Sequence, residues 1–363
     1  MRVSRIVVIA LVVVVIAIVG LYALGTFMAA STSSPVWHPA AAYPLQVSGT
    51  SGVAGQQCGN GTSYLYCIGG QDANGGPRSE TYFSSALSSS SVNITGWTLG
   101  SDQYPKSING QSCVAYSGYV YCVGGTYDDN QDDVASSYFA PLSSSGAMGS
   151  WTSTTSYPVP TDSQSCVTSM AYIYCVGGNN ETDGTNADSV SSNSVWYAQL
   201  SSSGVGAWSH STAYPKNIYF PSCFAAGGFV YCLGGADGNN NPLSADYYAP
   251  LSPTGVGAWT QTTAYPVRAS GQACVTSSGY IYCVGGEEGS SSFTNGVFCA
   301  PVSSGGIGAW KQAPNYPLSV STTCADLSGY VYCVGGFDGS SAGENGAVYY
   351  AAIASLSGAT TSG

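Results

Sequence analysis

Apolar and polar residues alternate over short stretches along most of the chain, and tyrosine and valine supply many of the apolar positions. A clear example is the pair of runs at residues 113–116 and 119–123, which residues 117–118 (Ser-Gly) separate. Such alternation, interrupted by turns that contain glycine, predicts antiparallel β-strands joined in hairpins. No segment after residue 30 shows the periodicity of a helix. This part of the chain is therefore expected to be all-β.

The same pair of runs recurs six times, at a spacing of 50 to 57 residues. In every copy two cysteines lie nine positions apart, and an aliphatic residue and Gly-Gly follow the second cysteine. The pairs are Cys58 and Cys67, Cys113 and Cys122, Cys166 and Cys175, Cys223 and Cys232, Cys274 and Cys283, and Cys324 and Cys333. A repeat of this length is typical of propellers and solenoids.

Hairpin geometry explains the nine-residue spacing. If residues 117–118 form a two-residue loop, Cys113 faces Cys122 across the two strands. Facing residues of a non-hydrogen-bonded pair have Cα atoms about 4.5 Å apart, a distance that a disulfide accepts. The third copy has Met170 and Ala171 at the loop, a poor match to the left-handed turns of two-residue hairpins. A four-residue loop would give the same facing pairs, so both loop lengths stay open.

Two further strands complete each repeat. One is aromatic and precedes a Ser/Gly turn, as at residues 138–143, and the other begins at a tryptophan that precedes Tyr-Pro. Four short antiparallel strands per repeat, repeated six times, predict a six-bladed β-propeller. An unpaired tryptophan strand at residues 37–44 opens the pattern, and an unpaired third strand at residues 348–356 ends it. Pairing these two strands would complete the sixth blade and remove the exposed sheet edges.

The apolar residue and Gly-Gly after an aromatic-rich strand, then a spaced aromatic residue and a tryptophan, resemble the kelch repeat over residues 37–356. Residues 265–268, Tyr-Pro-Val-Arg, are similar to the Pro-x-Arg approach to the next blade in that family. Other copies depart from it, because Lys106 and Lys216 directly follow the proline and the cysteine pair is an addition. The resemblance implies a propeller of kelch-like blades. Such propellers serve many functions, so the resemblance does not define an activity.

Residues 6–30 carry no charge, and residues 6–24 are almost wholly aliphatic. About 20 apolar residues span a bilayer, whereas the apolar core of a cleaved signal peptide has about 7–15. Arg2 and Arg5 precede the run and favour a cytoplasmic amino terminus. We therefore expect a transmembrane signal-anchor helix, with cleavage after residues 28–30 (Met-Ala-Ala) as the alternative.

This expectation divides the chain into five parts and makes it a single-pass membrane protein with an extracellular propeller. The parts are a cytoplasmic amino terminus at 1–5, the anchor at 6–30, a linker at 31–36, the propeller at 37–356, in which residues 37–44 close the last blade, and a tail at 357–363.

If the chain is exported, the twelve paired cysteines are expected to form disulfides, because such bonds persist in oxidising compartments. The alternative, reduced cysteines that bind a metal, requires closer Cys spacing and histidine ligands. Eight intervening residues in each pair, and two histidines in the whole chain, fit it poorly. We expect six local disulfides, one in each blade. The thirteenth cysteine, Cys299, stands where the other repeats have an aromatic residue and is expected to be a small buried hydrophobe.

The acidic residues predict a binding surface. In a blade of alternating strands, the loops between strands two and three share one face with the links from strand four to the next blade. Fourteen of the eighteen acidic residues lie in the first kind of loop, and three basic residues lie in the second kind. The opposite face consists of Ser/Gly turns with almost no charge. The candidate binding residues of the acidic face are Asp72, Asp128, Asp129, Asp132, Asp133, Glu181, Asp183, Asp237, Glu287, Glu288, Asp338, Lys106, Lys216 and Arg268.

The oxygen-rich runs at residues 128–133 and 179–183 contain donors suited to Ca²⁺. No copy matches a known calcium loop, and solvated acidic loops that keep a poorly charged protein in solution are the alternative interpretation. We therefore predict no metal site and no cofactor. Nucleic acid is not an expected partner, because the exported part carries eighteen acidic and five basic residues.

The sequence gives little support to an enzymatic activity. Galactose oxidase, a kelch-like propeller, uses tyrosines and histidines to bind copper, but His38 and His210 each follow a tryptophan on an outermost strand. The aspartate box of sialidases is absent. An activity like that of sialic-acid epimerases would require several Arg or His residues in the central funnel, where only Arg268 and two lysines qualify. With no Ser-His-Asp arrangement and no phosphate loop, we predict that the protein is not an enzyme.

Loops on a rigid, closed scaffold are where recognition usually resides. The sequence therefore predicts extracellular recognition of a protein or a glycan by the acidic face, and the alternative is a structural component of the cell envelope. Asn60, Asn93 and Asn180 begin N-glycosylation sequons in exported loops or turns.

Overall fold

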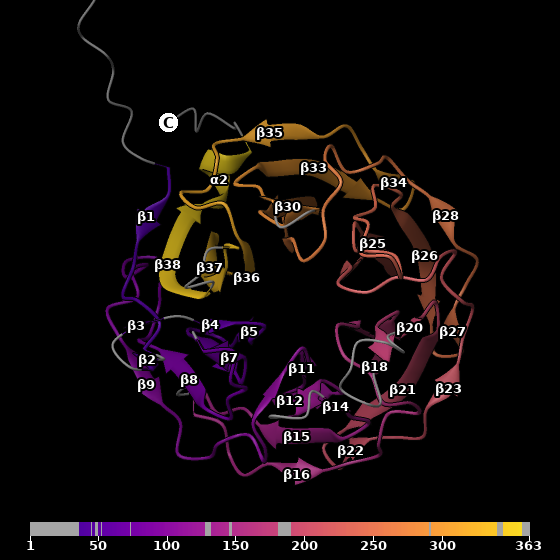
Figure 1. The fold of residues 1–363 in the computed structure, drawn as a ribbon, viewed down its shortest axis with the longest axis horizontal. Coiled ribbons are helices and arrows are strands. Elements are labelled where there is room, and N and C mark those ends of the chain that lie inside the picture. Colours follow the sequence, from indigo (N-terminus) through magenta and orange to yellow (C-terminus); the bar gives the residue numbers. More distant parts are fainter. Residues whose placement is uncertain are drawn as a thin grey trace, which may run out of the picture. The chain divides into compact units, whose positions relative to one another are not determined.

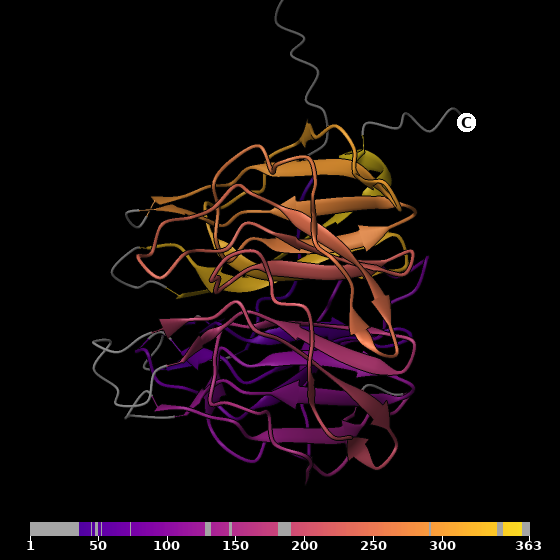
Figure 2. The same ribbon diagram turned by 90° about the vertical axis from the view of Figure 1, so that its right-hand side faces the viewer.

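Six antiparallel sheets surround a central axis in the computed structural model, and each sheet forms one blade of a β-propeller (Figure 1). Seen from the side, the strands run between the two faces of the ring (Figure 2). The structure describes residues 36–44, 46–47, 50–51, 53–72, 74–127, 132–144, 147–180, 190–289, 292–339 and 344–357. The predicted six-bladed all-β propeller is confirmed for this part of the chain.

Each blade consists of four main strands, which follow one another in sequence from the axis outward. Blade one contains β5 (Gln57–Asn60), β6 (Leu65–Ile68), β8 (Thr81–Ser84) and β9 (Trp97–Leu99). Blade two contains β11 (Ser112–Tyr116), β12 (Tyr119–Val123), β15 (Ser137–Pro141) and β16 (Thr152–Ser153). Blade three contains β17 (Ser165–Ser169), β18 (Tyr172–Val176), β21 (Val195–Ser201) and β23 (Ser209–His210).

Blade four contains β24 (Ser222–Ala226), β25 (Phe229–Leu233), β26 (Tyr247–Ser252) and β28 (Thr260–Gln261). Blade five contains β29 (Ala273–Ser277), β30 (Tyr280–Val284), β33 (Val297–Ser303) and β35 (Lys311–Ala313). In blades three to five a two-residue strand also pairs with the end of the third strand; these are β22 (Gly204–Val205), β27 (Gly255–Val256) and β34 (Gly306–Ile307).

The sixth blade is built from both ends of the propeller, as the sequence predicts. It contains β36 (Ser321–Leu327), β37 (Tyr330–Phe337), β38 (Glu344–Ala352) and β1 (His38–Pro39). His38 pairs with Tyr350. The third strand begins and ends four residues earlier than predicted, because β38 ends at Ala352 and a helical turn, α2 (Ile353–Leu356), follows. Ile353 and Leu356 of this turn are buried, which explains why apolar residues continue past the strand.

Short strand pairs lie among the loops of one face. They are β2 (Gln46–Val47) with β3 (Thr50–Ser51), β4 (Val53–Ala54) with β7 (Gln71–Asp72), β10 (Ile108–Asn109) with β13 (Thr126–Tyr127), which also pairs with β14 (Asp132–Asp133), β19 (Asn179–Asn180) with β20 (Val190–Ser191), and β31 (Glu287–Gly289) with β32 (Ser292–Phe293). The β10–β13 pairing joins the link that enters blade two to the loop between its second and third strands. These two kinds of loop therefore share a face, which we call the loop face, and the opposite one is the hairpin face.

The predicted transmembrane helix is wrong as a part of this fold. No helix in the described part of the chain is long and apolar enough to cross a membrane. Residues 6–30, on which the prediction was placed, lie outside the described residues. The prediction rested on hydropathy and length alone, and these show only that a segment is apolar enough to span, not that it forms a helix. The fold class that the structure supports is the all-β propeller alone.

Both predicted hairpin loops occur. In blade two, Ser117 and Gly118 have φ values of 50° and 79°, the left-handed conformation that two-residue hairpins require. Met170 and Ala171 adopt the same conformation, with φ values of 50° and 65°, although their side chains disfavour it. Blade one has the four-residue loop, because Asn60 pairs with Leu65.

Facing cysteines form a disulfide in every blade. Cys113 pairs with Cys122 in the strand register, and their Cα atoms are 4.1 Å apart. The second cysteine of each pair is fully buried. The remaining cysteine, Cys299, is free and buried, faces Tyr282, and directs its Sγ atom toward Leu356 O at 3.6 Å. The six predicted disulfides are thus confirmed.

The Gly-Gly pair lets adjacent blades approach closely. The second glycine donates its N–H to a carbonyl of the link that enters the next blade, as Gly125 does to Thr161 O at 2.8 Å. A Cβ atom on Gly124 would lie 2.4 Å from the same oxygen. Both glycines have positive φ, at 65° and 103°. Only glycine combines this backbone conformation with the missing side chain.

Aromatic residues fill the space between blades. The tyrosine of each Tyr-Pro dipeptide packs edge-to-face on the tryptophan of the next blade, and Tyr316 completes the circle by packing on Trp37 with ring centroids 5.0 Å apart. A second tyrosine, on the second strand, reaches the next blade with its hydroxyl. Tyr121 donates to Ser201 O at 2.8 Å, and Tyr332 donates to Val92 O at 2.7 Å. These repeated contacts make the ring rigid.

Blade four uses a carboxylate where the other blades use backbone. Asp246 is fully buried and accepts hydrogen bonds from Gly234 N at 2.9 Å and Tyr265 N at 2.5 Å. In blade two the equivalent donors, Gly124 N and Tyr157 N, bind backbone carbonyls. Burial raises the pKa of Asp246 to about 7, because desolvation outweighs the two donated hydrogen bonds.

Asp246 makes the stability of the fold depend on pH. The folded state binds the Asp246 proton more tightly than the unfolded chain does, so this contribution to stability is complete below about pH 4 and is lost as the pH rises toward 7. Each tenfold change in proton affinity corresponds to about 1.4 kcal/mol, so the decline amounts to a few kcal/mol. We expect Asp246→Asn to flatten the decline, measured by urea unfolding between pH 4 and pH 8. An identical pH slope in the variant would contradict the assignment.

Removing one disulfide should weaken the propeller without abolishing it. Replacing both Cys113 and Cys122 by alanine opens a loop of about ten residues, and the chain-entropy model gives a loss of about 2.5–3 kcal/mol in the free energy of unfolding. Denaturant unfolding measures this loss. Cys299→Ala, which removes a buried sulfur but no disulfide, is the control and should cost clearly less. Equal losses would show that the crosslink contributes nothing.

Candidate functional site

The first strand of each blade lines a central channel. A cavity of about 320 Å³ in this channel is bounded by the first cysteine of every blade and the residues directly before it, such as Gln111, Ser112 and Cys113 in blade two. The wall is polar, and its composition is similar from blade to blade.

Glutamines two positions before the first cysteine hold the wall together. Gln111 Nε2 donates to Ile68 O at 2.9 Å, and Gln164 Nε2 donates to Val123 O at 2.7 Å, each bridging to the preceding blade. Gln56 Nε2 donates to Val334 O at 2.7 Å and so bridges blade one to blade six. These side chains are almost completely buried. The channel wall is therefore mainly structural.

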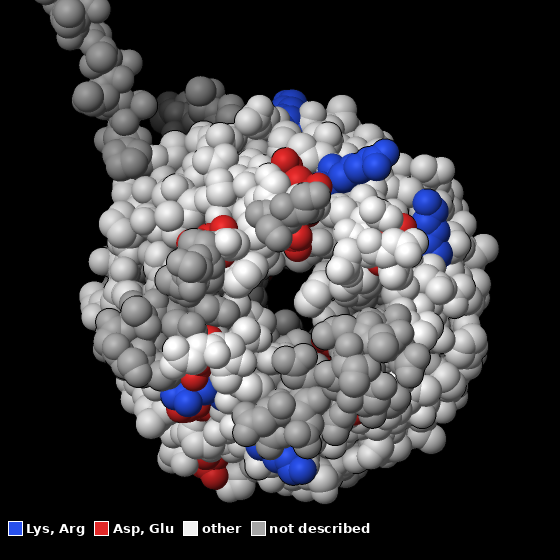
Figure 3. Space-filling view, in the orientation of Figure 1, with Lys and Arg blue, Asp and Glu red and all other residues white. Residues whose placement is uncertain are grey.

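A second cavity, also about 320 Å³, lies where the channel opens onto the loop face, and we call it the mouth. Every blade contributes to it. The opening lies at the centre of the space-filling view, and acidic side chains approach it more closely than basic ones do (Figure 3). Its lining consists of Ala54, Gly55, Gln71, Asn109, Gly110, Asp162, Phe220, Ser270, Gly271, Glu287, Phe293, Ser321 and Phe337.

Hydrogen bonds between neighbouring blades run around the base of the mouth. They connect the residues three positions before the first cysteine of each blade. Ser163 N donates to Gly110 O at 2.9 Å, Phe220 N to Ser163 O at 2.9 Å, Gly271 N to Phe220 O at 3.1 Å, and Ser321 Oγ to Gly271 O at 2.8 Å. These bonds hold the backbone from which the lining side chains project.

The six copies of the repeat can be compared with one another. The cysteines, the Gly-Gly pair and the buried tyrosine before the second cysteine are the same in all six. The positions that form the mouth differ. Three residues before the first cysteine the chain has Gly, Gly, Ser, Phe, Gly and Ser, and one residue earlier it has Ala, Asn, Asp, Tyr, Ser and Val. Positions that vary on a constant framework are the ones free to serve a function.

Phe220 occupies a backbone conformation that favours glycine. Its φ is 50°, and the equivalent residues Gly55, Gly110 and Gly271 have φ values of 65°, 64° and 63°. For a residue with a side chain, this left-handed conformation costs roughly 1–2 kcal/mol of conformational energy. The burial that the ring gains in return is incomplete, because 46% of Phe220 is exposed. Strain that stability does not explain is characteristic of binding and catalytic sites.

Two other phenylalanines line the mouth. Phe293 and Phe337 come from blades five and six and pack edge-to-face, with ring centroids 5.4 Å apart. Phe337 is 38% exposed. Together with Phe220 they make part of the lining aromatic.

Asp162 and Glu287 give the mouth a negative potential. Asp162 Oδ2 accepts a hydrogen bond from Ser163 Oγ at 2.7 Å. Glu287 exchanges backbone hydrogen bonds with Ser270, which fixes the start of β31. The same charges affect the pKa of Tyr219, the residue directly before Phe220. Burial, followed by the charges of Glu287, Asp237 and Asp162, raises the pKa of Tyr219 to about 12.

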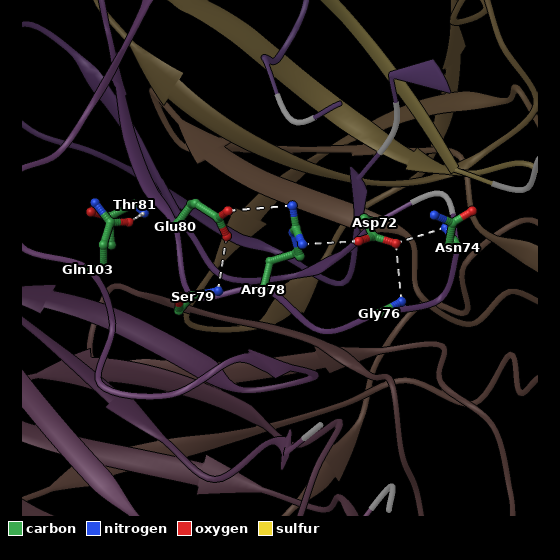
Figure 4. A network of polar contacts seen from close by, with 8 residues as sticks. All are labelled: Asp72, Asn74, Gly76, Arg78, Ser79, Glu80, Thr81 and Gln103. Atoms are coloured by element: carbon green, nitrogen blue, oxygen red, sulfur yellow. Dashed lines mark hydrogen bonds and ion pairs between the residues drawn. The ribbon is translucent and has the colours of Figure 1, made fainter. Parts of the chain in front are cut away.

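Of the candidate residues that the sequence predicts, Glu287 lines the mouth and the other described ones do not. Asp72 and Asp237 close their own turns. Asp72 Oδ1 accepts from Asn74 N at 2.8 Å and Gly76 N at 3.2 Å (Figure 4). Asp237 Oδ1 binds Asn239 N at 2.9 Å and Asn241 N at 3.0 Å. These two carboxylates have a structural role that the sequence analysis did not consider.

Arg78 lies between Asp72 and Glu80 on blade one (Figure 4). Its Nη1 is 3.4 Å from Asp72 Oδ2, and its Nη2 is 3.6 Å from Glu80 Oε1. The guanidinium thus pairs with carboxylates of its own loop.

The remaining candidates are dispersed over the loop face. Asp133 is buried and accepts from Thr126 Oγ1 at 3.0 Å, and Lys106 Nζ lies 4.6 Å from the centroid of the Tyr127 ring. The exposed candidates are Lys216, Arg268, Glu288 and Asp338. The following lie outside the described residues: Asp128, Asp129, Glu181 and Asp183, together with the side chain of Asp132.

The other candidates from the sequence lie away from the mouth. His38 and His210 are exposed on the outermost strands β1 and β23. Asn60 and Asn93 are exposed, whereas Asn180 is partly buried and its Nδ2 donates to Pro160 O at 2.6 Å. Within the described residues, no group of three or more His, Cys, Asp or Glu side chains is arranged to hold a metal ion.

The sequence analysis missed Asp162, Phe220, Phe293 and Phe337. A signal for Phe220 is present in the sequence, since it is a bulky residue three positions before a cysteine where other copies have Gly or Ser. Phe337 also carries a signal, because it stands directly after Gly-Gly, where the other copies have Gln, Thr, Asn, Ala and Glu. No such signal marks Phe293, because its loop differs in length from copy to copy.

Comparison with solved structures supports the fold. The "Structure of YjhT" covers 85% of this chain and 96% of its own, with a TM-score of 0.66 and 11% sequence identity. Similar chains number 590, so the architecture is widespread. At this identity the likeness shows the fold alone. No family model and no curated protein matches the chain, so membership in the kelch family is not shown.

The strain at Phe220 can be measured by replacing it with glycine. We expect Phe220→Gly to change the free energy of unfolding by no more than about 1 kcal/mol, because the release of left-handed strain, about 1–2 kcal/mol, offsets both the folding entropy that glycine costs, about 0.5–1 kcal/mol, and the partial burial of the ring. Phe337→Gly, an exposed phenylalanine without positive φ, is the control and should destabilise the protein. Equal losses in denaturant unfolding would show that Phe220 is not strained.

Proposed function

We propose that the protein is an extracellular recognition module that binds a glycan in the mouth of its propeller. The observation that carries the proposal is the variation of the mouth positions on an otherwise constant repeat, together with the strained, exposed ring of Phe220. A structural ring would need the repeated contacts, but it would gain nothing from a phenylalanine in a conformation that favours glycine.

The chemistry of the lining suits a sugar. Aromatic rings offer flat apolar faces that stack against the C–H groups of a pyranose ring. Gln71, Asn109, Ser270 and Ser321 supply side-chain donors and acceptors for hydroxyl groups. A volume of about 320 Å³ lies within the range of ligand sites in proteins, and it suits one or two sugar units rather than a folded domain.

An extracellular location is part of the proposal. Disulfides persist in oxidising environments and are rare in the cytosol, and this chain forms one in each of its six blades. A crosslinked scaffold also suits a binding site that must keep its shape in variable surroundings.

A glycan array probed with the full-length chain tests the proposal, followed by calorimetry on the best ligand. We expect Phe337→Ala to weaken binding by about 3- to 10-fold, since an aromatic contact contributes about 0.5–1.5 kcal/mol beyond burial. Tyr280→Ala is the matched control, because Tyr280 is 37% exposed, close to the 38% of Phe337, but lies beside the turn between β29 and β30 on the hairpin face. Failure to bind any glycan, or equal effects of the two variants, would overturn the proposal.

A further inference from the structure

The charged side chains in the described lining of the mouth have the same sign. Asp162 and Glu287 contribute carboxylates, and no lysine, arginine or histidine belongs to the described lining. They come from blades three and five, so the negative charge does not belong to one loop.

The basic residues of the propeller lie elsewhere. Arg78 pairs with Asp72 and Glu80, and Lys106 lies over the Tyr127 ring. Lys216 and Arg268 are exposed outside the mouth, and Lys311 belongs to the outermost strand of blade five. The segments after residue 36 that the structure does not describe contain no lysine, arginine or histidine in their sequence. The described lining of the mouth therefore carries a net negative charge.

Carboxylates and aromatic rings in one cavity are the two features that bind organic cations. A carboxylate attracts an ammonium group directly, and the face of an aromatic ring attracts it through the ring quadrupole. Cavity walls of low dielectric strengthen this attraction relative to open solvent. The same field repels carboxylates, so the mouth disfavours acidic sugars.

We propose that the mouth selects an amino sugar with a free, protonated amine over its N-acetylated and acidic counterparts. The inference rests on the proposed function, because the same aromatic faces and polar side chains would hold the sugar ring. Glu287 and Asp162 are assigned to the ammonium group, and Phe220, Phe293 and Phe337 to the ring.

Three trisaccharides matched in size test the selection: the trimer of glucosamine with free amines, the trimer of N-acetylglucosamine, and a trimer of galacturonic acid. Calorimetry with the full-length chain is carried out at a pH that keeps the amines protonated. We expect the free amine to bind about 10-fold or more tightly than the N-acetylated trimer, the acid to bind most weakly, and added salt to weaken the first of these interactions. Equal affinities for the amine and N-acetyl trimers would overturn the inference.

Variants assign the selectivity to residues. Glu287→Gln should lower the affinity for the amine trimer by roughly 10- to 100-fold, the usual effect of losing a hydrogen bond to a charged group, and should leave the N-acetylated trimer unaffected. Glu288→Gln is the matched control, because Glu288 is the next residue, is exposed and does not line the mouth. Asp162→Asn provides a second variant on another blade, so that a folding defect in one does not decide the question. Unchanged selectivity in both variants would overturn the assignment.

The two proposals fail in different ways. If Phe337→Ala weakens a glycan that carries no amine, and the amine trimer binds no better, recognition at the mouth stands and the selection for amines falls. If no glycan binds at all, the proposed function falls and the inference falls with it.

Discussion

The close approach of adjacent blades is the constraint on which the rest of the structure depends. Residues 124–125, a Gly-Gly pair, show it most clearly, because a Cβ atom on Gly124 would lie 2.4 Å from the carbonyl of Thr161 in the link to the next blade. The N–H of Gly125 instead donates to that carbonyl. The link is thereby brought to the axis, where the residues that follow it form the mouth. Any side chain at these glycines would move the link, and with it the residues that line the cavity.

Repetition separates the parts of the protein that hold it together from the parts that distinguish one blade from another. The disulfides and the Tyr–Trp contacts occur in all six blades, so no single one of them defines a site. The mouth, in contrast, collects one or a few side chains from each blade, and it is asymmetric although the scaffold is nearly symmetric. Its phenylalanines lie on blades four to six, and its carboxylates lie on blades three and five.

The sequence predicts the fold well because each interaction that builds a blade is local and is repeated six times. The pairing of Cys113 with Cys122 follows from a spacing of nine residues, and the closure of the sixth blade follows from one unpaired strand at each end. The transmembrane helix predicted at residues 6–30 falls outside the described residues, and no helix in the described part of the chain is long and apolar enough to cross a membrane. The site was harder to predict. The acidic residues that the structure describes in these loops are on the expected face, but a carboxylate such as Asp72 points back to its own backbone, and the direction of a loop side chain cannot be derived from composition. Phe337 and Phe293 meet only because blades five and six are neighbours in space.

The pairing of β1 with β38 has a consequence for how the protein is made. His38 of β1 pairs with Tyr350 of β38, and the indole nitrogen of the preceding Trp37 donates to the carbonyl of Pro314, 277 positions further along the chain. A ribosome therefore releases the first strand long before its partner exists. Until β38 is synthesised, β1 has no partner strand and the growing propeller remains open at its sixth blade. The first five hairpins need only nearby residues, so they can fold and form their disulfides before synthesis ends. The pairing of β1 with β38 then closes the propeller.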